Sequence, residues 1–353
     1  MTATSETEKP TTPPAEGPAA SRSLGATIVD FIRKFLALRE GSIILVTLVT
    51  LLYFVASSSR FGSSDNFKTL LPYFAPVAIV AAGEVFVMIL GEIDLSVGAI
   101  YLFIPFVWDK LDGLGIGLYP SLIGALIVAV VIGAINGFFV AYVGMSSFVT
   151  TLGMLFTLDG LTLIISHSTP VSPVPGTETV GLTSFQQIFG GGTYSELIWA
   201  IGIVIVLQVI LSFTRWGLYT VAVGGNRVAS AEAGIRTRQI IIRNFMLSAL
   251  LAGFVGVLEV VRTTSATPDP SGSNALLLIF VAAAIIGGTL MTGGEGTIVG
   301  ALIGALFIGI LQDGLIIKGV SANYYFFYLG IAVIIAMSLN VVVRRIRSGS
   351  GHG

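Results

Sequence analysis

Long apolar segments separated by short polar ones make up most of this chain. A helix needs about 20 mostly apolar residues to cross a bilayer, and ten segments approach that length. They lie at residues 41–58, 70–89, 93–109, 120–143, 147–166, 196–213, 244–262, 274–290, 297–317 and 323–342. The pattern predicts an all-α polytopic membrane protein with about ten transmembrane helices.

The composition supports a membrane protein and excludes several chemistries. Hydrophobic residues make up 54% of the chain and charged residues 10%, whereas a soluble domain has about 25% charged residues. The net charge is −1, which gives no reason to expect nucleic acid as a partner. There is no cysteine and there are only two histidines, His167 and His352, so we expect no disulfide and no metal site.

The positions of lysine and arginine predict the orientation of the chain, because cytoplasmic loops are enriched in them. With an even number of spans and a cytoplasmic N-terminus, 13 of the 18 fall in cytoplasmic segments. The C-terminal "RRIR" at 344–347 is then cytoplasmic as well. We therefore expect both termini in the cytoplasm.

The same pattern divides the chain into a membrane domain and two tails. Residues 1–40 form a polar cytoplasmic tail that we expect to be disordered, and its segment 28–38 is either a short amphipathic helix at the membrane surface or a solvated lead-in. The membrane domain covers 41–342, and residues 343–353 form a second cytoplasmic tail.

Two loops of the membrane domain are long. Residues 167–195 carry no lysine or arginine and are expected outside, whereas 214–243 carry five arginines and are expected in the cytoplasm.

The segment "MILGEIDLSVGAI", 88–100, places carboxylates within apolar sequence. Gly91 can adopt a turn between two spans. Asp94 then stands where a helix begins, and its carboxylate is predicted to accept hydrogen bonds from the N–H groups of Ser96 and Val97. This structural role is the first expectation for Asp94.

Two further acids in this region are candidates for a functional role. Glu84 lies deeper within a span, where a charge costs about 2.5–3.5 kcal/mol on insertion scales. Glu92 either faces a polar cavity or lies at the level of the lipid headgroups. Intramembrane acids generally mark functional sites, so both stay candidates.

The chain lacks a nucleotide-binding loop but offers a surface for a partner that has one. No lysine follows a glycine, so the phosphate-binding pattern GxxxxGK[ST] is absent from the sequence. In the cytoplasmic loop, a short helix is predicted from Val228 to Ala233, with Gly234 as its C-terminal cap. Such a helix suits docking into a cleft of an ATPase subunit. The alternative is an ordinary positively charged cytoplasmic loop.

Small residues recur about every four positions in "GALIVAVVIGAING", 124–137, and "GTIVGALIGALFIG", 296–309. This spacing places them on one face of each helix. In membrane proteins such faces allow helices to approach closely. We therefore predict tight helix contacts at both stretches.

Five motifs in order carry a resemblance to a known family. They are "GEIDLSVGA", "GAINGFFVAYVGMSSFVTTLG", "AVGGNRVASAEAGIRTRQI", "LSALLAGFVGVL" and "IIGGTLMTGGEGTIVGALIGALFIGILQDGL". Residues 41–342 resemble the membrane permease subunit of bacterial ABC importers for ribose, xylose, galactose and related sugars. Glu92 replaces a glycine that is frequent in this family and is similar to xylose-type members. Ser146 and Ser147 stand where the family often has two prolines.

The resemblance implies a type II ABC importer-like permease in the cytoplasmic (inner) membrane of a bacterium. It implies a homodimer, a cytoplasmic ATPase subunit with two nucleotide-binding domains that binds ATP and Mg²⁺, and an extracytoplasmic sugar-binding protein. No cofactor is expected in this chain, and its own role is transport of a monosaccharide rather than catalysis.

The resemblance and the intramembrane polar residues together give two sets of candidate site residues. The candidates for the substrate path are Glu84, Phe86, Glu92, Asp94, Asn136 and Phe148. The candidates for coupling to the ATPase are Arg227, Glu232, Ala233, Gly234 and Arg236. Two alternatives remain: a proton-coupled secondary transporter that uses Glu84 or Asp94 as a relay, and an ABC permease for branched-chain amino acids or nucleosides.

Overall fold

The structure is a computed structural model that describes residues 40–172, 182–192, 194–321 and 324–349. The expectations for tail residues 1–39, with the amphipathic segment at 28–38, and for residues 173–181 and 193 of the external loop lie outside the described residues. Residues 350–353 of the second tail also lie outside them.

The described chain is almost entirely helical, which confirms the all-α prediction. An isolated β-bridge pairs Val171 with Ala266. The elements are α2 (Gly41–Ser57), α3 (Ser64–Ile89), α4 (Val97–Gly113), α5 (Leu118–Phe138), the π-helical turn η1 (Phe139–Val143), α6 (Ser147–Ser166), α7 (Leu182–Ile188), α8 (Ser195–Phe213), α9 (Arg215–Gly225), α10 (Arg227–Glu232), α11 (Thr237–Thr263), α12 (Pro270–Ile286), α13 (Ile298–Ile317) and α14 (Tyr325–Gly349).

Six of these helices are long and apolar enough to cross a membrane: α3, α5 with η1, α6, α8, α11 and α13. Each of the ten segments predicted from the sequence falls on a helix, but α2, α4, α12 and the apolar part of α14 are shorter. The 17 residues of α4 span about 26 Å, less than the roughly 30 Å of a hydrocarbon core. Next to α4 and α12 lie the non-helical segments 90–96 and 287–297.

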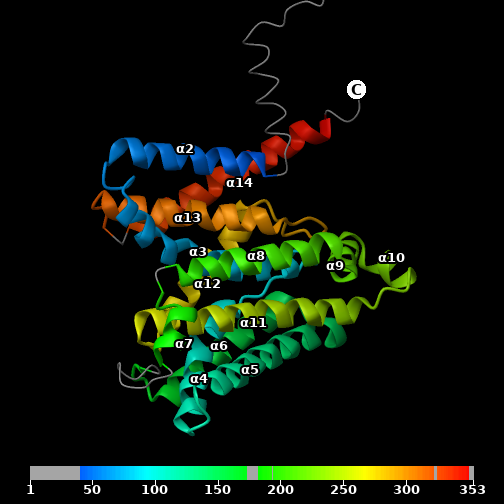
Figure 1. The fold of residues 1–353 in the computed structure, drawn as a ribbon. Coiled ribbons are helices and arrows are strands. Elements are labelled where there is room, and N and C mark those ends of the chain that lie inside the picture. Colours follow the sequence, from blue (N-terminus) through cyan, green and yellow to red (C-terminus); the bar gives the residue numbers. More distant parts are fainter. Residues whose placement is uncertain (1–39, 173–181, 193, 322–323, 350–353) are drawn as a thin grey trace, which may run out of the picture.

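The helices run roughly side by side along one axis of the molecule (Figure 1). The short helix α10 projects at one end and α7 lies at the other, and we call these the α10 end and the α7 end. Helix α2 begins, and α14 ends, toward the α10 end (Figure 1). The central helices are α3 and α11, which pack against each other; α11 also packs against α4 and α5, and α3 against α13. In α3, 89% of the apolar window is buried.

The glycine-rich faces make the close helix contacts that their spacing predicts. A β-carbon at Gly133 of α5 would lie 2.4 Å from the carbonyl oxygen of Phe245 in α11. A β-carbon at Gly304 of α13 would lie 2.2 Å from the carbonyl oxygen of Ala283 in α12. Only glycine permits these distances, so it fixes how closely the helices pack.

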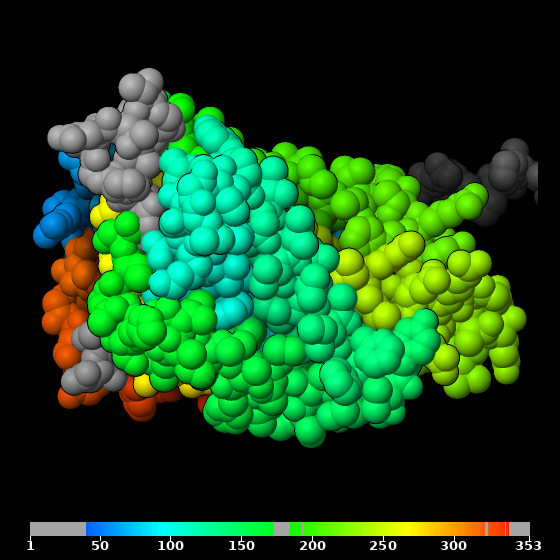
Figure 2. Space-filling view, turned by 90° about the horizontal axis from the view of Figure 1, so that it is seen from below, coloured from blue at the N-terminus to red at the C-terminus, as the bar shows by residue number. Residues whose placement is uncertain are grey.

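A broad face of the molecule is formed by α4, α5 and α6, and Figure 2 looks onto it. Large apolar side chains of α5 and α6 are exposed there, among them Ile127, Val131, Phe148 and Phe156. In water such a surface would be unfavourable, so it is a surface for lipid or for another protein chain.

Candidate functional site

The segment between α3 and α4 is a non-helical break within the bundle. Gly91 has a φ of 74°, a left-handed conformation that favours glycine. Asp94 is fully buried, and its Oδ1 accepts hydrogen bonds from the backbone N–H of Ser96 at 2.9 Å and from the Ser96 hydroxyl at 2.6 Å. The prediction for the Ser96 N–H is confirmed. The second donor is this hydroxyl and not the N–H of Val97, because the N-cap of α4 is Ser96, two residues later than expected.

Side chains of α6 satisfy backbone groups of the break. The N–H of Ile93 donates to the hydroxyl of Ser147 at 3.2 Å, and the N–H of Leu95 donates to the hydroxyl of Thr151 at 2.9 Å. Unpaired backbone groups are costly inside a membrane. These two contacts supply partners for backbone N–H groups that a helix would otherwise have satisfied.

Three of the candidate path residues, Glu84, Asp94 and Asn136, meet in one buried polar cluster. The Asn136 side chain of α5 donates to the Ser96 hydroxyl at 2.9 Å, and the Ser248 hydroxyl of α11 donates to Glu84 at 2.6 Å. The Glu84 carboxyl is a neighbour of Asp94 in the interior of the bundle. All three candidates are 0% exposed, and each keeps one oxygen without a hydrogen-bond donor among the described residues. The cluster joins α3, α4, α5 and α11.

The two aromatic path candidates lie apart from each other. Phe86 is fully buried, and its ring lies 5.7 Å from that of Trp216 in α9. Phe148 is 54% exposed in the first turn of α6. Phe86 is thus a core residue in this structure, whereas Phe148 faces outward.

The short helix predicted in the cytoplasmic loop is present as α10, shifted by one residue from the expected Val228–Ala233. The side chain of Asn226 caps it by accepting from the N–H of Ala229 at 3.0 Å. Gly234 follows the helix with a φ of 84°, as expected of a C-terminal cap. The surrounding coupling candidates Glu232, Ala233 and Arg236 are exposed.

The first residue of α10 is tied directly to the break. Arg227 Nη2 lies 2.7 Å from Glu92 Oε1 and donates to the carbonyl oxygen of Leu90 at 3.4 Å. Glu92 is therefore paired with the first residue of the projecting helix α10. The sequence gives no signal for this pair, because its partners are 135 positions apart.

Backbone contacts reinforce this connection. A β-carbon at Gly224, near the end of α9, would lie 1.7 Å from the carbonyl oxygen of Ile89 at the end of α3. The same carbonyl accepts a hydrogen bond from the N–H of Gly294 at 2.8 Å. We call the ends of α3 and α9, residues 292–296 and the Glu92–Arg227 pair the joint. At Gly224 it leaves no room for a side chain between α9 and the end of α3.

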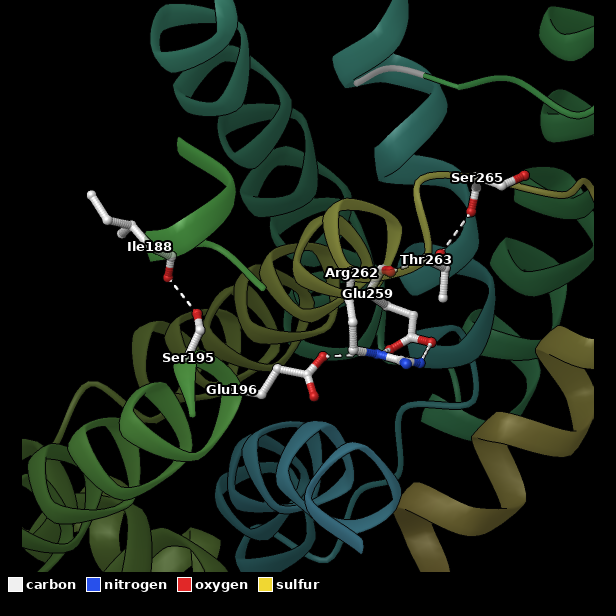
Figure 3. Close-up of polar contacts among 7 residues, drawn as sticks. All are labelled: Ile188, Ser195, Glu196, Glu259, Arg262, Thr263 and Ser265. Atoms are coloured by element: carbon white, nitrogen blue, oxygen red, sulfur yellow. Dashed lines mark hydrogen bonds and ion pairs between the residues drawn. The ribbon is translucent and has the colours of Figure 1, made fainter. Parts of the chain in front are cut away.

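A second ionic cluster, at the α7 end, was not identified from the sequence (Figure 3). Arg262, near the end of α11, forms ion pairs with Glu259 of its own helix and with Glu196 of α8, whose Oε1 lies 3.3 Å from Arg262 Nε. The spacing of Glu259 and Arg262 is a helical i, i+3 signal. The sequence could not predict that Glu196 joins this pair, because only the folding of the chain brings the start of α8 close to the end of α11.

Comparisons with known proteins place this architecture in a family. Residues 66–343 match the family model described as "Branched-chain amino acid transport system / permease component". The chain is 31% identical to the xylose/arabinose import permease protein XylH of Sulfolobus acidocaldarius, with 90% of this chain and 88% of that protein covered.

Two relatives from Escherichia coli K12 are similar over comparable lengths. The ribose import permease protein RbsC is 33% identical, covering 83% of this chain and 91% of that protein. The D-allose transport system permease protein AlsC is 28% identical, covering 87% and 93%. The comparison with solved structures found no match. The chain therefore belongs to this family as a multi-pass membrane permease component of an ABC transport system, in which a separate subunit hydrolyses ATP.

Proposed function

We propose that this chain is the permease subunit of an ABC importer that carries a monosaccharide, a pentose or a hexose, across the cytoplasmic membrane of a bacterium. Three relatives that are 28–33% identical over most of the chain are named for xylose and arabinose, for ribose and for D-allose. The family description mentions branched-chain amino acids, so the choice of a sugar rests on these relatives.

The proposed topology has ten membrane crossings of a type II importer-like permease, with both termini and α10 in the cytoplasm. The positions of the described ends support it, because α2 begins and α14 ends toward the α10 end (Figure 1). The short spans α4 and α12 complete their crossing with the partly buried non-helical segments beside them. The α7 end is then external.

In this proposal α10 is the coupling helix, and the pair of Arg227 with Glu92 is the observation that carries it. An ATPase subunit with two nucleotide-binding domains grips α10 and binds ATP and Mg²⁺. Because Arg227 is paired with Glu92 and Gly224 packs directly against the end of α3, a displacement of α10 moves the end of α3 and the break with it. The break contacts α5 and α6 through Ser96, Asn136 and Thr151, so the spans move in turn.

Two other partners complete the proposed importer. An extracytoplasmic sugar-binding protein docks at the α7 end, where the long external loop lies. A second permease copy forms a homodimer. Phe148 faces outward from α6, so it can line only a path that two copies share. Glu84, Phe86, Asp94 and Asn136 are buried within one copy, and their proposed role is to shape the moving spans.

Reconstitution into liposomes tests this function. The permease, the ATPase and the binding protein are combined, and uptake of radiolabelled D-xylose, D-ribose and D-allose is measured with and without ATP. We expect ATP-dependent uptake of at least one sugar, and none when the ATPase is omitted. Uptake by the chain alone in a proton gradient would support the secondary transporter instead. ATP-dependent uptake of L-leucine or a nucleoside, without any sugar, would change the assigned cargo.

A further inference from the structure

A cavity of about 480 Å³ opens among α3, α4, α11, α12 and α13 in the half of the molecule toward the α7 end. Its size is within the range of small-molecule sites, which is about 300–1,000 Å³. Tyr73, Tyr101 and Phe280 line it together with Glu259, Arg262 and Gln312. None of these residues belongs to the joint or to the buried polar cluster described above.

The cavity combines apolar faces with polar groups that have no partner. Tyr101 is 9% exposed, and its ring lies 5.9 Å from that of Phe280. Neither the Tyr101 hydroxyl nor the Gln312 amide is hydrogen-bonded to any residue in the described part of the chain. Gln312 is partly exposed, and the Tyr101 hydroxyl is not among the fully enclosed unpaired atoms. Both groups are therefore available to hydrogen-bond a ligand that enters the cavity.

Two prolines of α3 add a backbone acceptor to the same wall. Pro72 and Pro76 both line the cavity and lie within α3. Pro76 has no N–H, so the carbonyl oxygen of Pro72 lacks its α-helical donor. This oxygen can accept a hydrogen bond from a ligand hydroxyl.

The charges at the cavity favour a neutral ligand rich in hydroxyl groups. Arg262 is already paired with Glu259 and Glu196 (Figure 3), so it is not free to bind a carboxylate. The two carboxylates around one guanidinium would repel an anionic group. A zwitterionic amino acid needs such an anion site, whereas a sugar offers hydroxyl donors and acceptors and an apolar face of C–H groups.

A second cavity gives access from the outside. It measures about 220 Å³, and Thr69 and Tyr73 line both cavities. It extends to Ser63, which precedes α3, and to Arg60 in the loop between α2 and α3. The two cavities together follow the outer half of α3 inward from this loop.

We propose that the larger cavity is an outward-facing binding site for a monosaccharide inside a single permease copy. This inference rests on the proposed function, because it takes the sugar as the cargo. The sugar stacks an apolar face on Tyr101 and Phe280, and its hydroxyls bind Gln312, Tyr101 and Glu259. A site of this kind receives sugar released by the binding protein before the spans move.

The absence of cysteine from the chain makes a labelling test direct. Gln312→Cys is introduced into the otherwise cysteine-free permease, and the complete transporter is reconstituted. A membrane-impermeant thiol reagent is added from outside, with and without D-xylose, D-ribose or D-allose, and with L-leucine as a ligand control. Ser321→Cys, an exposed position just after α13, serves as the matched site outside the cavity.

We expect a saturating transported sugar to slow labelling at position 312 about fivefold or more, with no effect of L-leucine and no protection at 321. Equal labelling rates with and without sugar would overturn the proposal. So would labelling at 321 with none at 312, because the cavity would then be closed to the outside. Either result combined with normal ATP-dependent sugar uptake refutes only this site, whereas absence of sugar uptake refutes the proposed function.

A second variant tests the site without a cysteine. Tyr101→Phe removes only the unpartnered hydroxyl and is expected to raise the sugar concentration needed for half-protection by about three- to tenfold, the usual effect of one hydrogen bond. Tyr325→Phe is its control, because this hydroxyl is also buried without a partner but lies in α14, away from the cavity. Equal half-protection in Tyr101→Phe and the control would contradict the hydrogen bond to the sugar.

Discussion

The ion pair between Glu92 and Arg227 is the most direct test of how movement reaches the membrane. It links the first residue of α10 to the break at 2.7 Å. Glu92→Gln and Arg227→Gln each remove one charge with little change in volume. The double replacement Glu92→Arg with Arg227→Glu restores an ion pair in which the two charges have exchanged places.

The exposure of the two side chains determines how much free energy the ion pair contributes. The Arg227 side chain is 43% exposed and that of Glu92 is 13% exposed. A fully exposed pair contributes about 0.2–1 kcal/mol and a buried one considerably more, so screening limits this pair to about 1 kcal/mol. That energy corresponds to a factor of about five in an equilibrium between two states of the joint.

The assay is the amount of sugar taken up per ATP hydrolysed in proteoliposomes that contain the complete importer. We expect about a fivefold lower ratio in each single variant and recovery of most of the ratio in the charge-reversed double variant. Arg243→Gln, which changes an exposed arginine of α11 outside the joint, should match the unmodified protein. Unchanged ratios in both single variants would show that the pair does not transmit movement. A double variant as defective as the single ones would show that Arg227 acts on the ATPase and not on Glu92.

Three further predictions follow from single positions. Gly224→Ala would place a β-carbon 1.7 Å from the carbonyl oxygen of Ile89 and should sharply lower the yield of monodisperse protein in size-exclusion chromatography. Gly225→Ala is the control, because Gly225 has open space around it and its yield should not fall. Equal yields of the two variants would refute the tight contact at Gly224. Phe86→Ala should cost about 3–5 kcal/mol and lower the melting temperature clearly more than Phe148→Ala, and the reverse order would contradict the burial of Phe86. Gly234→Ala should destabilise the end of α10 by about 1 kcal/mol, because Gly234 has a φ of 84°. Hydrogen exchange in α10 should then be faster, and unchanged exchange would argue against the role of Gly234 as a cap.

Hydropathy located the helices well where the bilayer alone decides their limits. Helix α6 covers 147–166, as predicted, and α8 differs by one residue. Helix α11 begins at Thr237 and not at 244, because its first turns are polar and extend beyond the apolar part. Helix α12 begins at Pro270, a residue favoured in the first turn, and ends before Gly287.

The break shows what hydropathy cannot detect. The apolar pattern begins a span at residue 93, but α4 begins at Val97. The difference arises because Asp94 bonds to Ser96 and because Ser147 and Thr151 hold the backbone of Ile93 and Leu95. The first of these bonds is local and could be predicted. The others join residues 54 and 56 positions apart, so only the packed structure reveals them.

The sequence predicted which polar residues and which short helix belong to the candidate site, but not which of these residues contact each other. The short helix and its glycine cap follow from local sequence, and they are present. The pairing of Glu84 with Ser248 joins positions 164 apart, and that of Asn136 with Ser96 joins positions 40 apart. These pairs depend on which helix faces lie together. Sequence spacing could therefore name the polar residues but could not separate core residues such as Phe86 from surface residues such as Phe148.

The acids of the break are better understood as parts of a moving element than as sugar ligands. Asp94 is enclosed and its Oδ1 is bonded to Ser96, while Glu92 is paired with Arg227. The cavity that suits a sugar lies toward the α7 end, among other residues. The two regions should therefore respond differently: variants at Tyr101 should raise the sugar concentration needed for protection, and variants at Glu92 should lower uptake per ATP without changing that concentration. If a change at Glu92 weakened sugar protection at position 312 as strongly as a change at Tyr101, the break itself would contact the sugar, and this separation of binding from coupling would be wrong.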